Sequence, residues 1–204
     1  EMHMQLIGKA EAWLDKEAPV DSRKENALTA EILLTDLARL RSQMSKIAGK
    51  PMIVRRHVDD QVADFVQRDD YADLARRGPL TPDHIIRTKR FPMVGASQDS
   101  LDRYVKEYGS YVEEFRHRIR TEFTEIDPAP RIVLDPEIGM LTAGFTSKDA
   151  QIAADIYHHT IPVLCRSEDH LGGYEALSGE ELFDVQYWDL EQAKLLKSVK
   201  PPEL

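Results

Sequence analysis

The stretch IVLDPEIGMLTAGFTSKDAQIAADIYHHTI, residues 132–161, decides the fold that the sequence predicts. An apolar run predicts a strand over 131–134, and a second apolar run predicts another strand over 139–145. Asp135-Pro136 separates the two runs and is typical of a turn, because proline fixes its own backbone and has no N–H to donate. The first half of the stretch therefore predicts two short strands with a turn between them.

The second half of the stretch predicts a helix. Thr146 and Asp149 are three positions apart at its start, the spacing at which a hydroxyl and a carboxylate cap the first helical turn. The helix is expected to continue from Ala150 to Ile161, and Pro162 is expected to kink or end it. Two strands followed by a helix indicate an α/β unit.

Helical spacing of apolar residues dominates the remaining sequence, so the predicted fold class is α/β, rich in helix and with a small sheet. Short strands are expected over 52–54 and 91–94. The expected helices cover residues 4–14, 26–48, 58–76 (as one or two short helices), 98–123, a segment capped by Ser178 and Glu181, and a last segment from Asp189 to Lys197.

Composition bounds the function classes. The chain has 204 residues, of which 42% are hydrophobic and 31% charged, so it is neither wholly disordered nor membrane-spanning. Its net charge of −9 argues against nucleic acid as a partner, because phosphate neutralisation requires a basic face. The single cysteine, Cys165, cannot form an internal disulfide and fits a cytoplasmic setting.

One basic segment interrupts this acidic chain: RGPLTPDHIIRTKR, residues 77–90. Thr81 followed by Pro82 is a strong signal for the start of a helix, and the free N–H groups of a helix start can bind an anion. Arg87 and Lys89 could reach an oxyanion, the former as a planar fork and the latter as a point charge.

Two further side chains of the segment could take part in a reaction. His84 could transfer a proton, and Asp83 could orient a hydroxyl or a histidine. The alternative interpretation is that Asp83 only caps the helix and that Arg87 pairs with an acid on the surface. The candidate substrate- or phosphate-binding residues are Thr81, Asp83, His84, Arg87 and Lys89.

No metal site is predicted. The seven histidines form neither an H-x-H pair nor an H-E-x-x-H motif. His57 could contact a metal together with Asp59 and Asp60, but nothing near them in the sequence completes a ligand set. The sequence also has no G-x-G-x-x-G dinucleotide fingerprint.

Three segments carry a family resemblance: RGPLTPDHIIRTKR, DPEIGMLTAGFTSKDAQIAADIYHHTI and LGGYEALSGEELFDVQYWDLEQAKL. They resemble the bifunctional class II aldolase/short-chain dehydrogenase family, which includes rhamnulose-1-phosphate aldolase/alcohol dehydrogenases. The resemblance extends from about Met2 to Lys197. It implies a class II aldolase/adducin-like fold, with the strand–helix element around Glu137-Ile138-Gly139 as a partial or degenerate second copy of the aldolase element.

The resemblance also implies an organisation and a function. Residues 1–48 would continue an aldolase-like domain, residues 49–197 would form its C-terminal α/β region, and residues 198–204 would be a linker. The parent reaction would be zinc-dependent retro-aldol cleavage of a ketose 1-phosphate to dihydroxyacetone phosphate and an aldehyde. Zinc, and the NAD of a fused dehydrogenase, would be bound outside this chain, which alone would be inactive.

The expected partners are a sugar phosphate and either further copies of the chain or the rest of the parent protein. The alternative is a non-catalytic interaction or oligomerisation module that bridges the aldolase and dehydrogenase domains.

Overall fold

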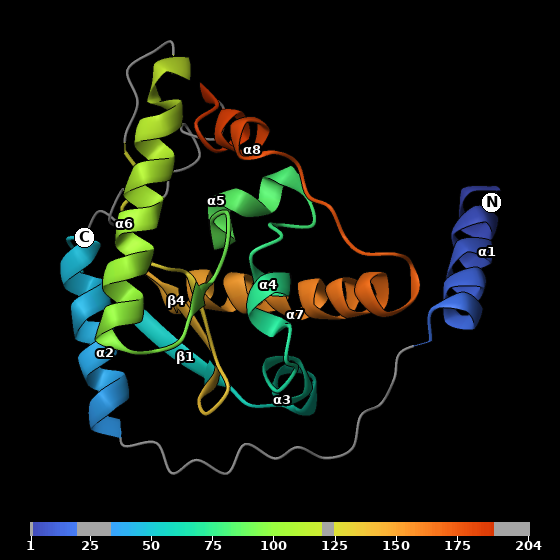
Figure 1. The fold of residues 1–204 in the computed structure, drawn as a ribbon, viewed down its shortest axis with the longest axis horizontal. Helices are drawn as coiled ribbons and strands as arrows, with labels where there is room; N and C mark the ends of the chain where they lie inside the picture. Colours follow the sequence, from blue (N-terminus) through green and yellow to red (C-terminus); the bar gives the residue numbers. More distant parts are fainter. Residues whose placement is uncertain (1, 20–33, 120–124, 190–204) are drawn as a thin grey trace, which may run out of the picture.

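The computed structural model describes residues 2–19, 34–119 and 125–189 (Figure 1). Its centre is a four-stranded mixed sheet in the order β1-β4-β3-β2. Strands β3 and β4 pair antiparallel, β1 adds to β4 antiparallel, and β2 adds to β3 parallel. The strands are β1 (Ile53–His57), β2 (Met93–Val94), β3 (Ile132–Asp135) and β4 (Gly139–Gly144). The predicted strands at 131–134 and 139–145 are therefore confirmed within one residue at each end.

Asp135 explains why the chain turns between β3 and β4. Its Oδ1 accepts hydrogen bonds from the backbone N–H groups of Glu137 (2.9 Å) and Ile138 (3.1 Å). Its Oδ2 accepts from the N–H of Ala96, at 2.9 Å, just after β2. Gly139 closes the turn with φ +90°, a conformation that other residues rarely adopt. One carboxylate thus fixes both the hairpin and the neighbouring strand.

Helices cover both faces of the sheet, so the fold has three layers (Figure 1). Side chains alternate between faces along a strand. Ile132 and Leu134 of β3 therefore pack with α3, α4 and α7, whereas Val133 between them packs with α2, α6 and α8. All residues of β4 are buried, as expected for a strand covered on both sides.

The helices that form these layers begin and end as follows: α1 (Met2–Glu17), α2 (Leu34–Ile47), α3 (Asp60–Val66), α4 (Tyr71–Ala75), the 3₁₀ turn η1 (Pro82–His84), α5 (Ile85–Thr88), α6 (Gln98–Phe115), the 3₁₀ turn η2 (Arg116–Arg118), α7 (Ser147–His170) and α8 (Gly179–Gln186). The predicted helices over 4–14 and 58–76 are confirmed, the latter as two helices. Residues 26–33 of the predicted helix over 26–48 lie outside the described residues. So does the predicted helix from Asp189 to Lys197, except for Asp189 itself.

Helix α6 is shorter than predicted. It ends at Phe115, before the expected limit at residue 123, and η2 follows. Arg118 at the end of η2 donates to both carboxylate oxygens of Asp184, at 2.6 and 2.8 Å, and pairs with Glu180, both on α8. This contact joins η2 to α8, and helical periodicity in the sequence does not report it.

Helix α7 shows that Pro162 does not end a helix here, so that expectation is wrong. The helix begins with the predicted capping box of Thr146 and Asp149 and runs through Pro162 to His170. Proline cannot donate to the carbonyl four residues earlier, that of His158. The side-chain amide of Gln61 on α3 donates to this oxygen instead, at 2.5 Å. A neighbouring helix therefore satisfies the group that the proline leaves open.

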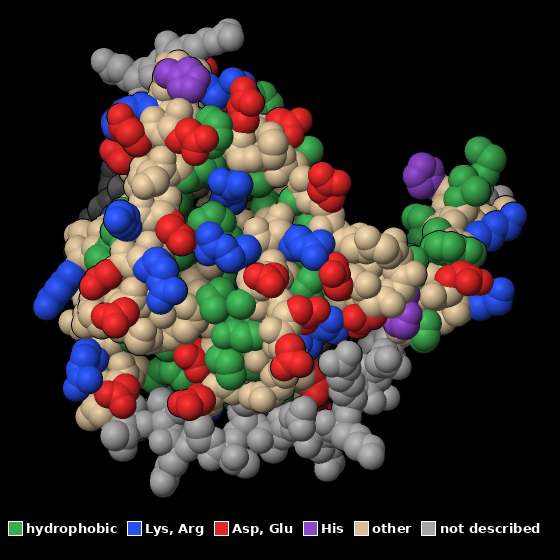
Figure 2. All heavy atoms as spheres, viewed as in Figure 1, with side chains coloured by type: hydrophobic (Ala, Val, Ile, Leu, Met, Phe, Trp, Pro, Cys, Tyr) green, Lys and Arg blue, Asp and Glu red, His purple; other side chains and the backbone are tan. Residues whose placement is uncertain are grey.

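Helix α1 stands apart from the three layers, and Figure 2 shows its apolar side chains exposed. None of the residues Met2–Glu17 is buried. The guanidinium of Arg166 on α7 holds its end, donating to the carbonyl of Ala18 at 2.7 Å and to Asp15 at 3.1 Å. None of the described helices is long and apolar enough to cross a membrane.

Candidate functional site: the basic segment beside α7

The segment around Thr81 starts a helix, as predicted, but without the predicted cap. Thr81 has the extended backbone of an N-cap residue (φ −133°, ψ 150°), and η1 then α5 follow. Its hydroxyl makes no capping hydrogen bond. Thr81 and Asp83 are both exposed to solvent.

Arg87 lies against the start of α7. Its Nη1 is 3.4 Å from Oδ1 of Asp149, and the two side chains are 44% and 35% exposed. The contact is weak because the distance is long and solvent screens both charges. The other carboxylate oxygen of Asp149 accepts hydrogen bonds from Thr146 in the capping box. Arg87 therefore keeps most of its donors for another acceptor, although the alternative of a surface ion pair is visible here too.

His84 is half-buried between these residues. Its Nδ1 is inaccessible to solvent and has no hydrogen-bond partner among the described residues. Burial lowers the pKa of His84, and the nearby charges of Asp83 and His159 act in opposite directions on it. The ring is thus mainly neutral at pH 7, which is the form able to accept a proton.

Lys89 does not share this surface. Its side chain is only 2% exposed, and its ammonium donates to the backbone carbonyl of Asp127 and lies 3.9 Å from the centre of the Tyr108 ring. Burial, together with the charge of Arg131, holds the pKa of Lys89 well below its ordinary value. Its backbone is left-handed, with φ +63°. Lys89 is therefore an internal tie, and four of the five predicted residues remain at the surface of the segment.

Two neighbouring arginines, both exposed, contact other parts of the protein at its surface. Arg77 donates to the carbonyl of Tyr174 at 3.0 Å and to Glu168 at 3.1 Å. Arg76 pairs with Glu107 at 3.1 Å. Much of the positive charge that marks this segment in the sequence therefore fastens it to α6 and α7.

A histidine pair lies on another side of α7, and sequence spacing does not reveal it. The rings of His57 on β1 and His158 on α7 are 5.4 Å apart, edge to face. His158 contacts an acceptor with each nitrogen, namely the Ala154 carbonyl and Asp59 Oδ2, both at 2.8 Å. His57 contacts the hydroxyl of Thr142 at 3.0 Å. These residues come from β1, β4, α7 and the N-cap of α3, and are therefore far apart in the sequence.

The two imidazoles titrate differently. Burial opposes the charge of His158, but its hydrogen bonds to Asp59 and Ala154 prevail and raise its pKa. Burial and the adjacent charge of His158 lower the pKa of His57. His158 is therefore protonated in preference to His57.

The described residues do not fit a catalytic zinc site. They contain no group of three or more histidine, cysteine, aspartate or glutamate side chains arranged to hold a metal ion. The nearest arrangement, around His158, has both ring nitrogens of that residue committed to other acceptors.

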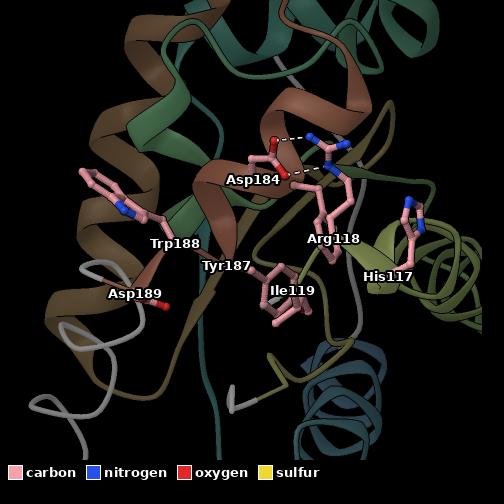
Figure 3. A pocket seen from close by; sticks show the side chains of 8 residues that line it. His117, Arg118, Ile119, Asp184, Tyr187, Trp188 and Asp189 are labelled. Carbon is pink, nitrogen blue, oxygen red and sulfur yellow. Dashed lines mark hydrogen bonds and ion pairs between the residues drawn. The ribbon is translucent and has the colours of Figure 1, made fainter. Parts of the chain in front are cut away.

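A hollow of about 450 Å³ lies at the end of α8, where Figure 3 shows the pair of Arg118 and Asp184. Trp188 and His117 lie on either side of this pair, and Trp188 is 54% exposed. The Arg118 charge is balanced by Asp184 and Glu180. The hollow therefore offers aromatic surface but no cation without a carboxylate beside it.

Comparison with known proteins places this three-layer domain in a family. The model for "Aldolase class II, second domain" matches residues 31–195, most of the chain, which therefore belongs to that family. The chain is also 29% identical over 196 residues to the "Uncharacterized oxidoreductase YuxG" of Bacillus subtilis (strain 168). The similarity covers 91% of this chain but 27% of YuxG. No solved structure matches.

Proposed function

We propose that this chain is the second domain of a class II aldolase whose parent protein cleaves a ketose 1-phosphate to dihydroxyacetone phosphate and an aldehyde. The observation that carries the proposal is the family match over residues 31–195. The catalytic zinc would be bound by another part of the parent protein. A fused short-chain dehydrogenase would use NAD. The name of YuxG as an oxidoreductase, and its much greater length, support such a fusion.

Within this proposal the domain supplies polar contacts to the sugar phosphate. Thr81, Asp83 and His84 are grouped at one turn beside α7, and Arg87 follows one helical turn later. The Arg87 guanidinium can donate two parallel hydrogen bonds to a phosphate or a sugar hydroxyl. Neutral His84 can exchange a proton with a hydroxyl. The buried ammonium of Lys89 anchors the segment by donating to the backbone carbonyl of Asp127.

The test is a retro-aldol assay on the parent protein that carries this domain, with Arg87→Ala as the variant. We expect the Michaelis constant for the ketose phosphate to rise about tenfold, because one charge-assisted contact contributes roughly 1.5 kcal/mol. Arg39→Ala is the matched control, since Arg39 is 70% exposed on α2, away from the segment. An unchanged Michaelis constant in Arg87→Ala would remove this residue from the substrate site.

The second candidate function is a non-catalytic module that docks domains or copies of the chain. The exposed apolar residues of α1 favour it: Met4 is 70% exposed and Trp13 is 55% exposed. Large apolar side chains gathered on one exposed helix are typical of a contact surface. A chain that forms a defined oligomer by light scattering, combined with Arg87→Ala kinetics like the wild type, would support this candidate over the first.

A further inference from the structure

A second hollow of about 450 Å³ lies between α6 and the end of the basic segment. Four basic side chains line it, and two carboxylates accompany them. The basic side chains are those of Arg76, Arg90, Arg103 and Lys106. The carboxylates are those of Glu107 and Glu114. An excess of positive charge in one concavity is notable because the whole chain carries a net charge of −9.

Aromatic rings form the floor of this hollow and orient two of its arginines. The guanidinium of Arg90 lies 5.0 Å from the centre of the Tyr111 ring and 5.8 Å from that of Phe91. The guanidinium of Arg76 lies over Phe91 at 4.7 Å. A guanidinium that rests on a ring keeps its N–H groups at its edge, where they can donate to an oxyanion. Figure 2 shows basic side chains around apolar ones between α6 and α5.

Three of the four cations lack a carboxylate of their own. Arg76 pairs with Glu107, but Arg90, Arg103 and Lys106 form no ion pair with any of the described residues. Arg103 and Lys106 are three positions apart on α6 and so share one face of that helix. Like charges held this close repel one another, and a bound anion would remove the repulsion.

We propose that this hollow binds the phosphoryl group of a small phosphorylated molecule. Its volume falls in the range of small-ligand pockets, roughly 300–1,000 Å³, which favours a small molecule over an extended polyanion. Arg90 supplies bidentate donors, and Arg76, Arg103 and Lys106 supply further charge. The rings of Phe91 and Tyr111 are buried beneath the guanidinium groups of Arg76 and Arg90 and hold them in place. The site shares no residue with Thr81, Asp83, His84 or Arg87, so it does not depend on the proposed aldolase reaction.

The experiment is calorimetric titration of the 204-residue chain with dihydroxyacetone phosphate, with inorganic phosphate and with unphosphorylated dihydroxyacetone, all at one ionic strength. We expect both phosphorylated probes to bind and dihydroxyacetone to give no heat. The double variant Arg103→Gln/Lys106→Gln should weaken binding at least tenfold, since charge-assisted contacts contribute roughly 1.5 kcal/mol or more each.

A matched control separates a site from general charge. Arg39→Gln/Lys46→Gln removes the same two charges from exposed positions of α2 and should leave the dissociation constant unchanged. Both pairs lie on the surface, so circular dichroism should show folded protein for each. The proposal is overturned if neither phosphorylated probe binds, or if the two double variants weaken binding equally. Arg87→Ala should leave this binding intact, so failure here and failure of the proposed function are distinguishable.

Discussion

The contact between His158 and Asp59 gives a prediction about pH, tested by Asp59→Asn. Asp59 has two tasks, because its Oδ1 caps α3 through the N–H of Val62 at 3.2 Å while its Oδ2 accepts from His158. Asparagine caps a helix about as well as aspartate. The substitution therefore keeps the cap and removes only the charge that faces His158.

The size of the effect follows from exposure. A shielded hydrogen bond between charged groups contributes roughly 1.5–3 kcal/mol, and an exposed ion pair roughly 0.2–1 kcal/mol. The side chains of His158 and Asp59 are 29% and 48% exposed, so the contact lies near the border of these ranges. We expect Asp59→Asn to lower the free energy of unfolding by about 1 kcal/mol at pH 6, which corresponds to roughly 2–4 °C in Tm.

The loss should shrink as pH rises. The folded-state pKa of His158 is raised above 6.5, so the stability it contributes is fully present below pH 6.5 and is lost as pH rises through the folded value. His57 acts in the opposite direction. Its pKa is lowered, so its contribution is present above pH 6.5 and is lost as pH falls through the folded value. Near pH 6.5 the contributions of both histidines are therefore present together.

The assay is urea unfolding of the wild type and Asp59→Asn at several values between pH 5.5 and 9. The difference in free energy should decline from about 1 kcal/mol towards zero across this range. Asp60→Asn makes the same chemical change one residue further along, at an exposed position, and should give a difference that does not vary with pH. A constant difference for Asp59→Asn, or an equal slope for Asp60→Asn, would refute the reasoning.

Two further predictions concern packing. A Cβ at Gly144 would lie 2.5 Å from the Ala150 nitrogen, so Gly144→Ala should destabilise the protein by about 2–3 kcal/mol in urea unfolding. Gly109 has open space around it, so Gly109→Ala should instead stabilise α6 by up to ~1 kcal/mol. Gln61→Ala should lower the free energy of unfolding by about 1 kcal/mol in the wild type. In Pro162→Ala the loss should be less than half of that, because the restored N–H can bond to the His158 carbonyl. Equal losses in a double-mutant cycle would contradict this account.

Local chemistry in the sequence predicts much of the fold. The capping boxes at Thr146 and Ser178 are both present, because each depends only on residues three positions apart. The strands β3 and β4 also follow from their own apolar residues and from the turn at Asp135. The mixed pairing order of the sheet does not follow, since β1 and β4 are far apart in the sequence and no local pattern encodes their contact.

The errors have one cause, which is contact with distant residues. Pro162 continues a helix because Gln61, about a hundred positions away, supplies the missing donor. Residue types group Lys89 with Arg87, but the ammonium of Lys89 contacts the Asp127 carbonyl and the Tyr108 ring inside the protein. His158 and Asp59 are 99 positions apart, so neither predicts the other. Residue types alone show that segment 77–90 is basic. They do not show which of its charged side chains face solvent and which are buried.

The covered sheet limits how this domain can change in length. Because Ile132 and Leu134 belong to one interior and Val133 to the other, inserting a single amino acid within β3 or β4 would send every later side chain of that strand into the wrong interior. Two added amino acids would restore the parity. Tolerated insertions between Ile132 and Gly144 should accordingly come in even numbers, unless they fall in the bend between Asp135 and Gly139, where the ladder imposes no such count.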